Sequence, residues 1–174
     1  MSEKDSIIKK FISDLDLFGG KRAARGRVHD QDLFSEFSEI FSSDEITNIC
    51  DSLMGSAEYY ASQINDLQET LNFIEDDDNA FINGGIQSLF EELQESIESL
   101  VDFIPGISLP HCRQDEEDDY LYTFNYQRWD RDVNDYEREG REFNENMATV
   151  IGMCKEMKES YKKFREAVRD TLAI

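Results

Sequence analysis

Apolar side chains recur at helical spacing along most of the chain. The clearest seam alternates steps of four and three residues without a miss, which is typical of long helices that pack at shallow angles. Ser42 and Glu45, just before it, have the spacing of a capping box. The pattern predicts one helix over 46–74, with this apolar stripe: Ile46, Cys50, Leu53, Ala57, Tyr60, Ile64, Leu67, Leu71 and Ile74.

Two further long seams follow the first. One runs from Ile82 to Ile104, with two glycines near its start that weaken its first turn. The other runs from Val133 to Val168 and predicts either one helix of about forty residues or two helices broken near Gly140.

The N-terminal region predicts two shorter helices. One buries a face over 7–15 and ends at a glycine pair, and the other begins with Asp30 as its N-cap and buries a face over 33–41. Between them we expect a basic loop over 21–27, which could bind an anion or dock onto acidic helices within the same molecule.

The strongest break in the helical pattern lies at Pro105 and Pro110, the two prolines of the chain. After them Tyr120, Tyr122 and Phe124 recur with the period of two that is typical of a strand. A short β-hairpin within 107–126 is one interpretation, and an aromatic entry into the next helix is the other.

These elements together predict an all-α fold. An isolated amphipathic helix leaves its apolar stripe in water, so long seams joined by short connections favour mutual packing. We expect residues 1–174 to form one domain, an antiparallel bundle of about five helices with long heptad-patterned helices. Pairing of the seams between two chains would make the bundle a homo-oligomer, and this alternative stays open.

Composition and charge narrow the functional classes. The 174 residues include 39 acidic and 18 basic side chains, a net charge of −21. Such a surface disfavours direct nucleic-acid binding, which depends on Lys and Arg displacing counterions from phosphates. The chain has no membrane-spanning apolar run and no secretory signal, and its three cysteines are too few and too scattered for a disulfide framework. We therefore expect a cytoplasmic protein with no membrane association.

The charge is strongly segregated along the chain. Residues 28–119 hold 24 acidic side chains and one basic residue, Arg113. Six cations near the C-terminus could neutralise part of this charge, but they are too few to cancel it: Lys155, Lys158, Lys162, Lys163, Arg165 and Arg169. The remaining carboxylates should create a negative potential that attracts basic partners.

This layout predicts a non-enzymatic binding protein that inhibits or sequesters a basic partner. A nucleic-acid-handling protein or a toxin has the complementary charge, because an acidic bundle can occupy a groove built for phosphates. Anti-CRISPR and anti-restriction proteins, antitoxins and immunity proteins share this physical type. The candidate contacts are the following carboxylates: Asp66, Glu69, Glu75, Asp76, Asp77, Asp78, Glu91, Glu95, Glu98, Asp115, Glu116, Glu117, Asp118 and Asp119.

An aromatic segment over 120–129 follows the last of these acids. Tyr, Trp and Arg are the residue types that most often anchor protein interfaces, which makes Tyr122 and Trp129 candidate contacts with the partner. The alternative is that these rings close the end of the bundle and take no part in binding.

Four acidic residues also suggest an enzyme. The pairs Glu92-x-x-Glu95 and Glu116-x-x-Asp119 resemble the ExxE…ExxD signature of the all-α nucleoside triphosphate pyrophosphohydrolases related to MazG. That resemblance implies a Mg²⁺ cofactor held by the four carboxylates, for attack on an α-phosphate. The binding-protein interpretation requires no cofactor. Phosphate-binding loops, nucleophile elbows and zinc-protease motifs are absent from the sequence.

Overall fold

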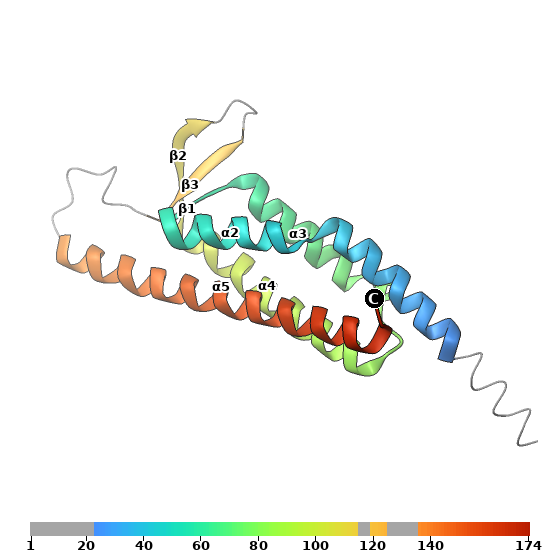
Figure 1. Ribbon diagram of the computed structural model, residues 1–174. Coiled ribbons are helices and arrows are strands. Elements are labelled where there is room, and N and C mark those ends of the chain that lie inside the picture. Colours follow the sequence, from blue (N-terminus) through green and yellow to red (C-terminus); the bar gives the residue numbers. More distant parts are fainter. Residues whose placement is uncertain (1–22, 115–118, 125–135) are drawn as a thin grey trace, which may run out of the picture.

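A computed structural model describes residues 23–114, 119–124 and 136–174 (Figure 1). These residues are mostly helical, with a small antiparallel sheet at one end. Residues 23–40 are helical, and the helices after them are α2 (Ser43–Ser56), α3 (Ala61–Glu75), α4 (Gly84–Ile107) and α5 (Tyr136–Leu172). A single 3-10 turn, η1 (Asp77–Asn79), joins α3 to α4.

The helices lie lengthwise against one another, and the chain reverses direction between them (Figure 1). Helix 23–40 and α2 follow each other in one row, while α3, α4 and α5 run alternately back and forth. The predicted capping box is present at the start of α2, where the Ser42 hydroxyl accepts from the Glu45 amide and the Glu45 carboxylate accepts from the Ser42 amide. The basic loop expected over 21–27 is wrong for its described residues, because 23–27 belong to a helix.

The single helix predicted over 46–74 is also wrong. Helix α2 ends at Ser56, Ala57 adopts a left-handed conformation with φ of 56°, and β1 (Glu58–Tyr60) precedes α3. The Ala57 carbonyl accepts from the Phe124 amide at 2.9 Å, so the break is stabilised by a partner far along the chain. Apolar spacing does not reveal such a break, because the buried stripe continues on both sides of it.

The sheet confirms the hairpin predicted within 107–126 and adds a strand to it. Strands β2 (Leu109–Gln114) and β3 (Tyr120–Thr123) pair antiparallel, and β1 pairs with the other edge of β3. The Tyr59 ring stacks on Tyr122 with centroids 5.2 Å apart, and its hydroxyl lies 2.7 Å from the Ser108 hydroxyl. The sheet thus ties the α2–α3 connection to the end of α4.

Both ends of α4 differ from the sequence pattern. Pro105 does not end the helix, which continues to Ile107, so the expected break falls after it. At the other end Asn83 is the N-cap, and its side chain accepts from the first amides of the helix. Ile82 therefore lies before the helix, and 64% of its surface is exposed. In α5, by contrast, the one-helix alternative is correct, because the helix passes through Gly140 without interruption.

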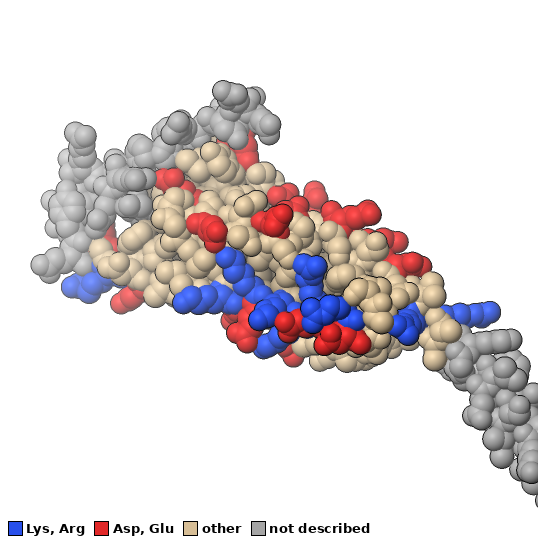
Figure 2. All heavy atoms as spheres, viewed as in Figure 1, with Lys and Arg blue, Asp and Glu red and all other residues tan. Residues whose placement is uncertain are grey.

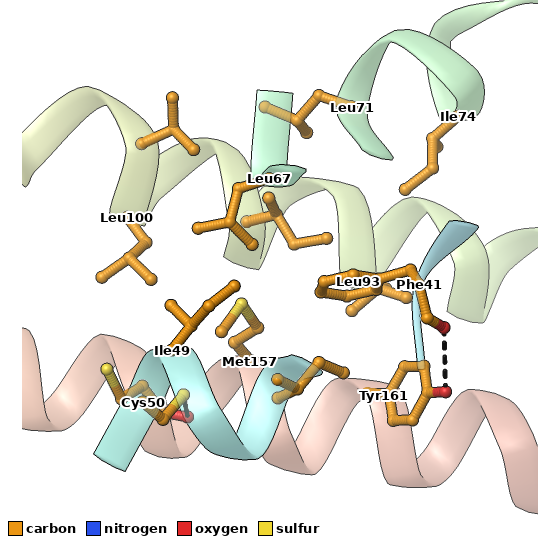
Figure 3. Close-up of a cluster of buried hydrophobic side chains, with 14 of the residues drawn as sticks. Phe41, Ile49, Cys50, Leu67, Leu71, Ile74, Leu93, Leu100, Met157 and Tyr161 are labelled. Atoms are coloured by element: carbon orange, nitrogen blue, oxygen red, sulfur yellow. Dashed lines mark hydrogen bonds between the residues drawn. The ribbon is translucent and has the colours of Figure 1, made fainter. Parts of the chain in front are cut away.

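The core is a continuous apolar layer between the helices (Figure 3). Its centre is an aromatic cluster in which Phe37, Phe90 and Phe164 have ring centroids 5.1 to 5.5 Å apart. Tyr161 of α5 also enters the core and donates its hydroxyl to the Phe41 carbonyl at 3.2 Å. Helix 23–40, α4 and α5 are thus joined through buried rings.

Two of the cysteines lie in this core, as the seams predicted. Cys50 and Cys154 are fully buried, and the Cys50 thiol lies 3.7 Å from the Cys154 carbonyl oxygen. The hydrogen bond with Cys50 and burial raise the pKa of the Cys154 thiol. Cys154 therefore remains a neutral thiol that packs as a small apolar side chain.

Asp30 has a different role from the predicted N-cap. It lies inside helix 23–40, is 2% exposed, and accepts from the amides of Ile82 and Asn83 at 2.7 and 3.0 Å. The neighbouring His29 ring nitrogen lies 3.1 Å from the Ala80 carbonyl oxygen. Helix 23–40 therefore holds the turn that leads into α4.

We expect Asp30→Ala to reduce the free energy of unfolding by about 2 to 3 kcal/mol, since two amides lose a charged acceptor. Urea denaturation measures this loss. Asp32→Ala removes an exposed carboxylate from the same helix and should change stability by less than about 0.5 kcal/mol. Equal effects of the two substitutions would show that Asp30 does not hold the turn.

Candidate functional site

Of the ten acidic candidates that the structure describes, nine lie at the surface of α3, of α4 and of the turn with η1 between them. The tenth, Asp119, is half-buried and precedes β3. We call these nine exposed carboxylates the acidic surface: Asp66, Glu69, Glu75, Asp76, Asp77, Asp78, Glu91, Glu95 and Glu98. On the face shown in Figure 2, acidic side chains lie along the upper edge, and the basic ones gather along α5 with acidic side chains among them. Neither α3, η1 nor α4 contains a Lys or an Arg.

Local hydrogen bonds stabilise the turn between α3 and α4, which carries several of these carboxylates. The Asp76 carboxylate accepts from the Asp78 amide at 3.0 Å, and its carbonyl accepts from the Asn79 amide at 2.8 Å. The Asn79 side chain in turn donates to the Phe73 carbonyl. These local bonds place Asp77 and Asp78 at an exposed corner of the molecule.

Asp66 lies where acidic side chains crowd together. Partial burial raises the pKa of Asp66 above the ordinary value, and three nearby carboxylates raise it further: Glu45, Glu69 and Asp119. The Asp119 carboxylate also accepts from the Ser62 amide at 3.2 Å, at the start of α3. The fold holds these like charges close together, and their repulsion lowers the stability of the folded state.

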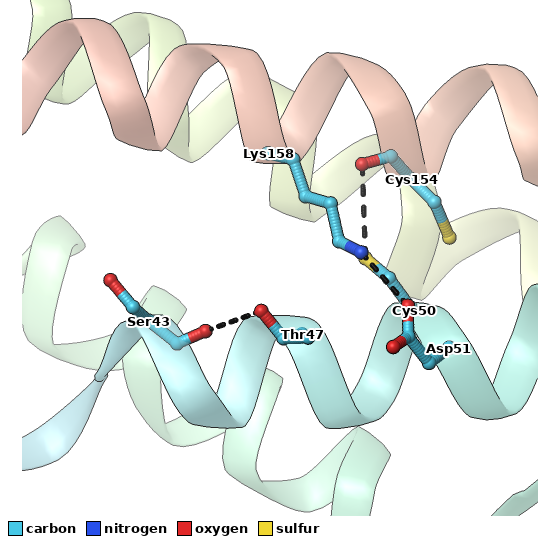
Figure 4. Close-up of polar contacts among 6 residues, drawn as sticks. All are labelled: Ser43, Thr47, Cys50, Asp51, Cys154 and Lys158. Carbon is cyan, nitrogen blue, oxygen red and sulfur yellow. Dashed lines mark hydrogen bonds and ion pairs between the residues drawn. The ribbon is translucent and has the colours of Figure 1, made fainter.

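The cations of α5 neutralise little of the acidic surface. Lys158 pairs with Asp51 of α2 at 3.0 Å (Figure 4), while Lys163 and Arg169 pair with Glu159 and Asp170 of α5 itself. All three pairs are largely exposed, and exposed pairs contribute at most about 1 kcal/mol.

A polar groove between α4 and α5 is the place where the two charge sets come nearest. Glu92 and Glu95 line it from α4, and Lys155 and Lys163 line it from α5. Small residues, Gly152 among them, also line it, and its volume is about 650 Å³. Two further glutamates of α5 line it, so the groove carries more carboxylates than cations.

The three described carboxylates of the pyrophosphohydrolase signature do not come together. Glu92 and Glu95 line the α4–α5 groove, whereas Asp119 bonds to the start of α3, and Glu116 lies outside the described residues. Within the described part of the chain, no group of three or more His, Cys, Asp or Glu side chains could hold a metal ion.

Of the two aromatic candidates, Tyr122 is half-buried and packs on Tyr59 inside the sheet. This position favours a structural role in closing the end of the bundle. Trp129 lies outside the described residues, as do Asp115, Glu116, Glu117 and Asp118 of the acidic run.

Sequence reasoning missed the role of the basic residues. Arg27 was expected to face an anion or an acidic helix, but its guanidinium donates to the Leu172 carbonyl at 2.6 Å, at the C-terminal end of α5. Gln31 donates to the same oxygen at 3.0 Å. A cation at this position stabilises the negative end of the α5 dipole. One general rule could have predicted this contact: basic side chains are favoured near the C-terminal turn of a helix.

The comparisons with known proteins give no further guide to the site. No family model, curated protein or solved structure matches the chain. Among the described residues, no helix is both long and apolar enough to cross a membrane.

We expect Asp66→Asn to raise stability at neutral pH by a few tenths of a kcal/mol, because it removes one of several crowded like charges. A carboxyl with a raised pKa binds protons more tightly in the folded state, so its destabilising effect fades as pH falls. The advantage of the variant should therefore shrink between pH 7 and about pH 4.5. Urea denaturation at both pH values measures the stability advantage of the variant. An advantage that grows as the pH falls would contradict a raised pKa of Asp66.

Proposed function

We propose that this protein is a non-enzymatic acidic binding protein that inhibits or sequesters a basic partner. A nucleic-acid-handling protein or a basic toxin has the required surface charge. The observation that supports the proposal is the acidic surface on α3, η1 and α4, where nine exposed carboxylates lie on elements without a single cation.

The energetics of this surface favour a role in binding over a role in folding. Ordinary helices alternate acidic and basic residues, because opposite charges four residues apart stabilise a helix and like charges destabilise it. Helices α3 and α4 forgo this stabilisation. The fold offsets the loss through buried apolar side chains of α3 and α4 such as Leu67, Leu93 and Ile97.

The proposed mechanism is electrostatic attraction followed by steric exclusion. A surface of one charge speeds the encounter with a partner of the opposite charge and orients it. Carboxylates at the Asp76–Asp78 corner and along α4 would then replace counterions on the partner's Lys and Arg side chains. A partner that handles nucleic acid could no longer bind phosphates with the same residues.

The test begins with affinity capture of partners from the native cell. A captured basic protein is then purified, and its affinity for this protein is measured by titration. We expect its affinity to fall steeply as salt rises from about 50 to 500 mM, and a DNA duplex to compete for the same partner. Replacing Asp76, Asp77 and Asp78 by Asn should weaken binding at least tenfold.

The matched control replaces Glu156, Glu159 and Glu166 of α5 by Gln. The net charge then changes by the same amount as in the triple Asp variant. The control should bind almost as tightly as the unaltered protein. Salt-independent binding, or equal loss in both variants, would contradict the proposal. So would Mg²⁺-dependent hydrolysis of a nucleoside triphosphate that Glu92→Gln/Glu95→Gln abolishes.

A further inference from the structure

A second surface of the molecule has the opposite character. A groove of about 600 Å³ lies between α5 on one side and helix 23–40 with α2 on the other. Its floor is apolar and includes Phe34, Ile46 and Tyr161. This volume falls in the range of about 300 to 1,000 Å³ that is typical of sites for small organic ligands.

The rim of the groove carries four cations from α5: Lys158, Lys162, Arg165 and Arg169. Their spacing of four, three and four residues places them on one face of the helix over about three turns. Glu166 is the one acidic side chain among the lining residues described. Lys158 and Arg169 are already paired with Asp51 and Asp170, so the cations that the rim offers to a ligand are Lys162 and Arg165.

Two of these cations have no carboxylate partner among the described residues. Arg165 donates to the Ser43 hydroxyl at 2.6 Å, and its guanidinium carbon lies 5.7 Å from the centre of the Tyr161 ring. These contacts fix the side chain at the rim and occupy only part of its five N–H donors. Lys162, one turn away, is exposed and forms no ion pair with a described residue.

The start of α2 also borders the groove, but its first turn carries Asp44 and Glu45, which offset the partial positive charge of its first amides. Ser43 is the first residue of α2, and it lines the groove beside Arg165. The Thr47 hydroxyl also lines the groove but donates to the Ser43 carbonyl (Figure 4).

We propose that this groove binds an amphipathic organic anion, a carboxylate or phosphate attached to an apolar chain or ring. The head group would lie between Lys162 and Arg165, and the apolar part would cover Phe34, Ile46 and Tyr161. Charge complementarity selects an anion, and the apolar floor selects one with a hydrophobic part. This site is separate from the acidic surface, and it does not depend on the proposed function.

The test uses decanoate, decyl phosphate, decyltrimethylammonium and acetate, each below its micelle concentration. Binding is followed by amide NMR shifts of α2 and α5 and by calorimetry. We expect decanoate or decyl phosphate to shift the amides that line the groove, and the tighter of the two identifies the preferred head group. Decyltrimethylammonium and acetate should bind at least tenfold more weakly, because each lacks one of the two required features.

Lys162→Gln/Arg165→Gln should weaken binding of the anion at least tenfold. The control Lys155→Gln/Lys163→Gln removes the same charge from α5 but faces the α4–α5 groove, so its affinity should stay within twofold. Equal loss in both variants, equal binding of decyltrimethylammonium, or no shift with either anion would overturn the proposal. Self-association of the protein that Lys162→Gln/Arg165→Gln abolishes would also overturn it, in favour of a second copy in the groove.

Discussion

Burial of apolar side chains between the helices is the interaction on which the rest of this structure depends. Helices α2, α3 and α4 contain no Lys or Arg, so ion pairs cannot join them to one another. Like charges on neighbouring helices cost a few tenths of a kcal/mol per pair, whereas one buried phenylalanine contributes about 1.5 to 3 kcal/mol. Leu53 of α2, Leu67 of α3 and Leu93 of α4 are fully buried in one core, which therefore holds together helices whose surface charges repel each other. Because apolar burial stabilises the fold, the carboxylates are left for another role.

The sequence predicted the elements that arise from local periodicity and local capping. The Ser42–Glu45 capping box was predicted outright, whereas the unbroken α5 and the hairpin after Pro105 were each one of two interpretations. All three depend on residues close together in the chain. The features it did not predict depend on distant partners. Ala57 breaks the long seam because its carbonyl is bonded by Phe124, and Asp30 is buried in a helix because it accepts from Ile82 and Asn83. An apolar stripe carries no information about such contacts.

The candidate site, too, was predicted only in part. Charge counting located the acidic surface, since carboxylates on α3, η1 and α4 without neighbouring cations are necessarily exposed. The charge count did not predict which surfaces the cations of α5 line. Lys158 pairs with Asp51, but Lys162 and Arg165 line a groove against helix 23–40 and α2 and leave the acidic surface unpaired. The molecule thus has an acidic surface and, separate from it, a groove with Lys162 and Arg165 at its rim, and each would select a different ligand.

The central claim is that the acidic surface keeps its negative potential because the cations of α5 do not mask it. Paramagnetic relaxation of amide protons by a cationic and an anionic nitroxide, compared residue by residue, measures that potential directly. We predict a strongly negative potential at exposed amides of α3, η1 and α4, and a positive one beside Lys162 and Arg165. Similar potentials over both surfaces would contradict the account.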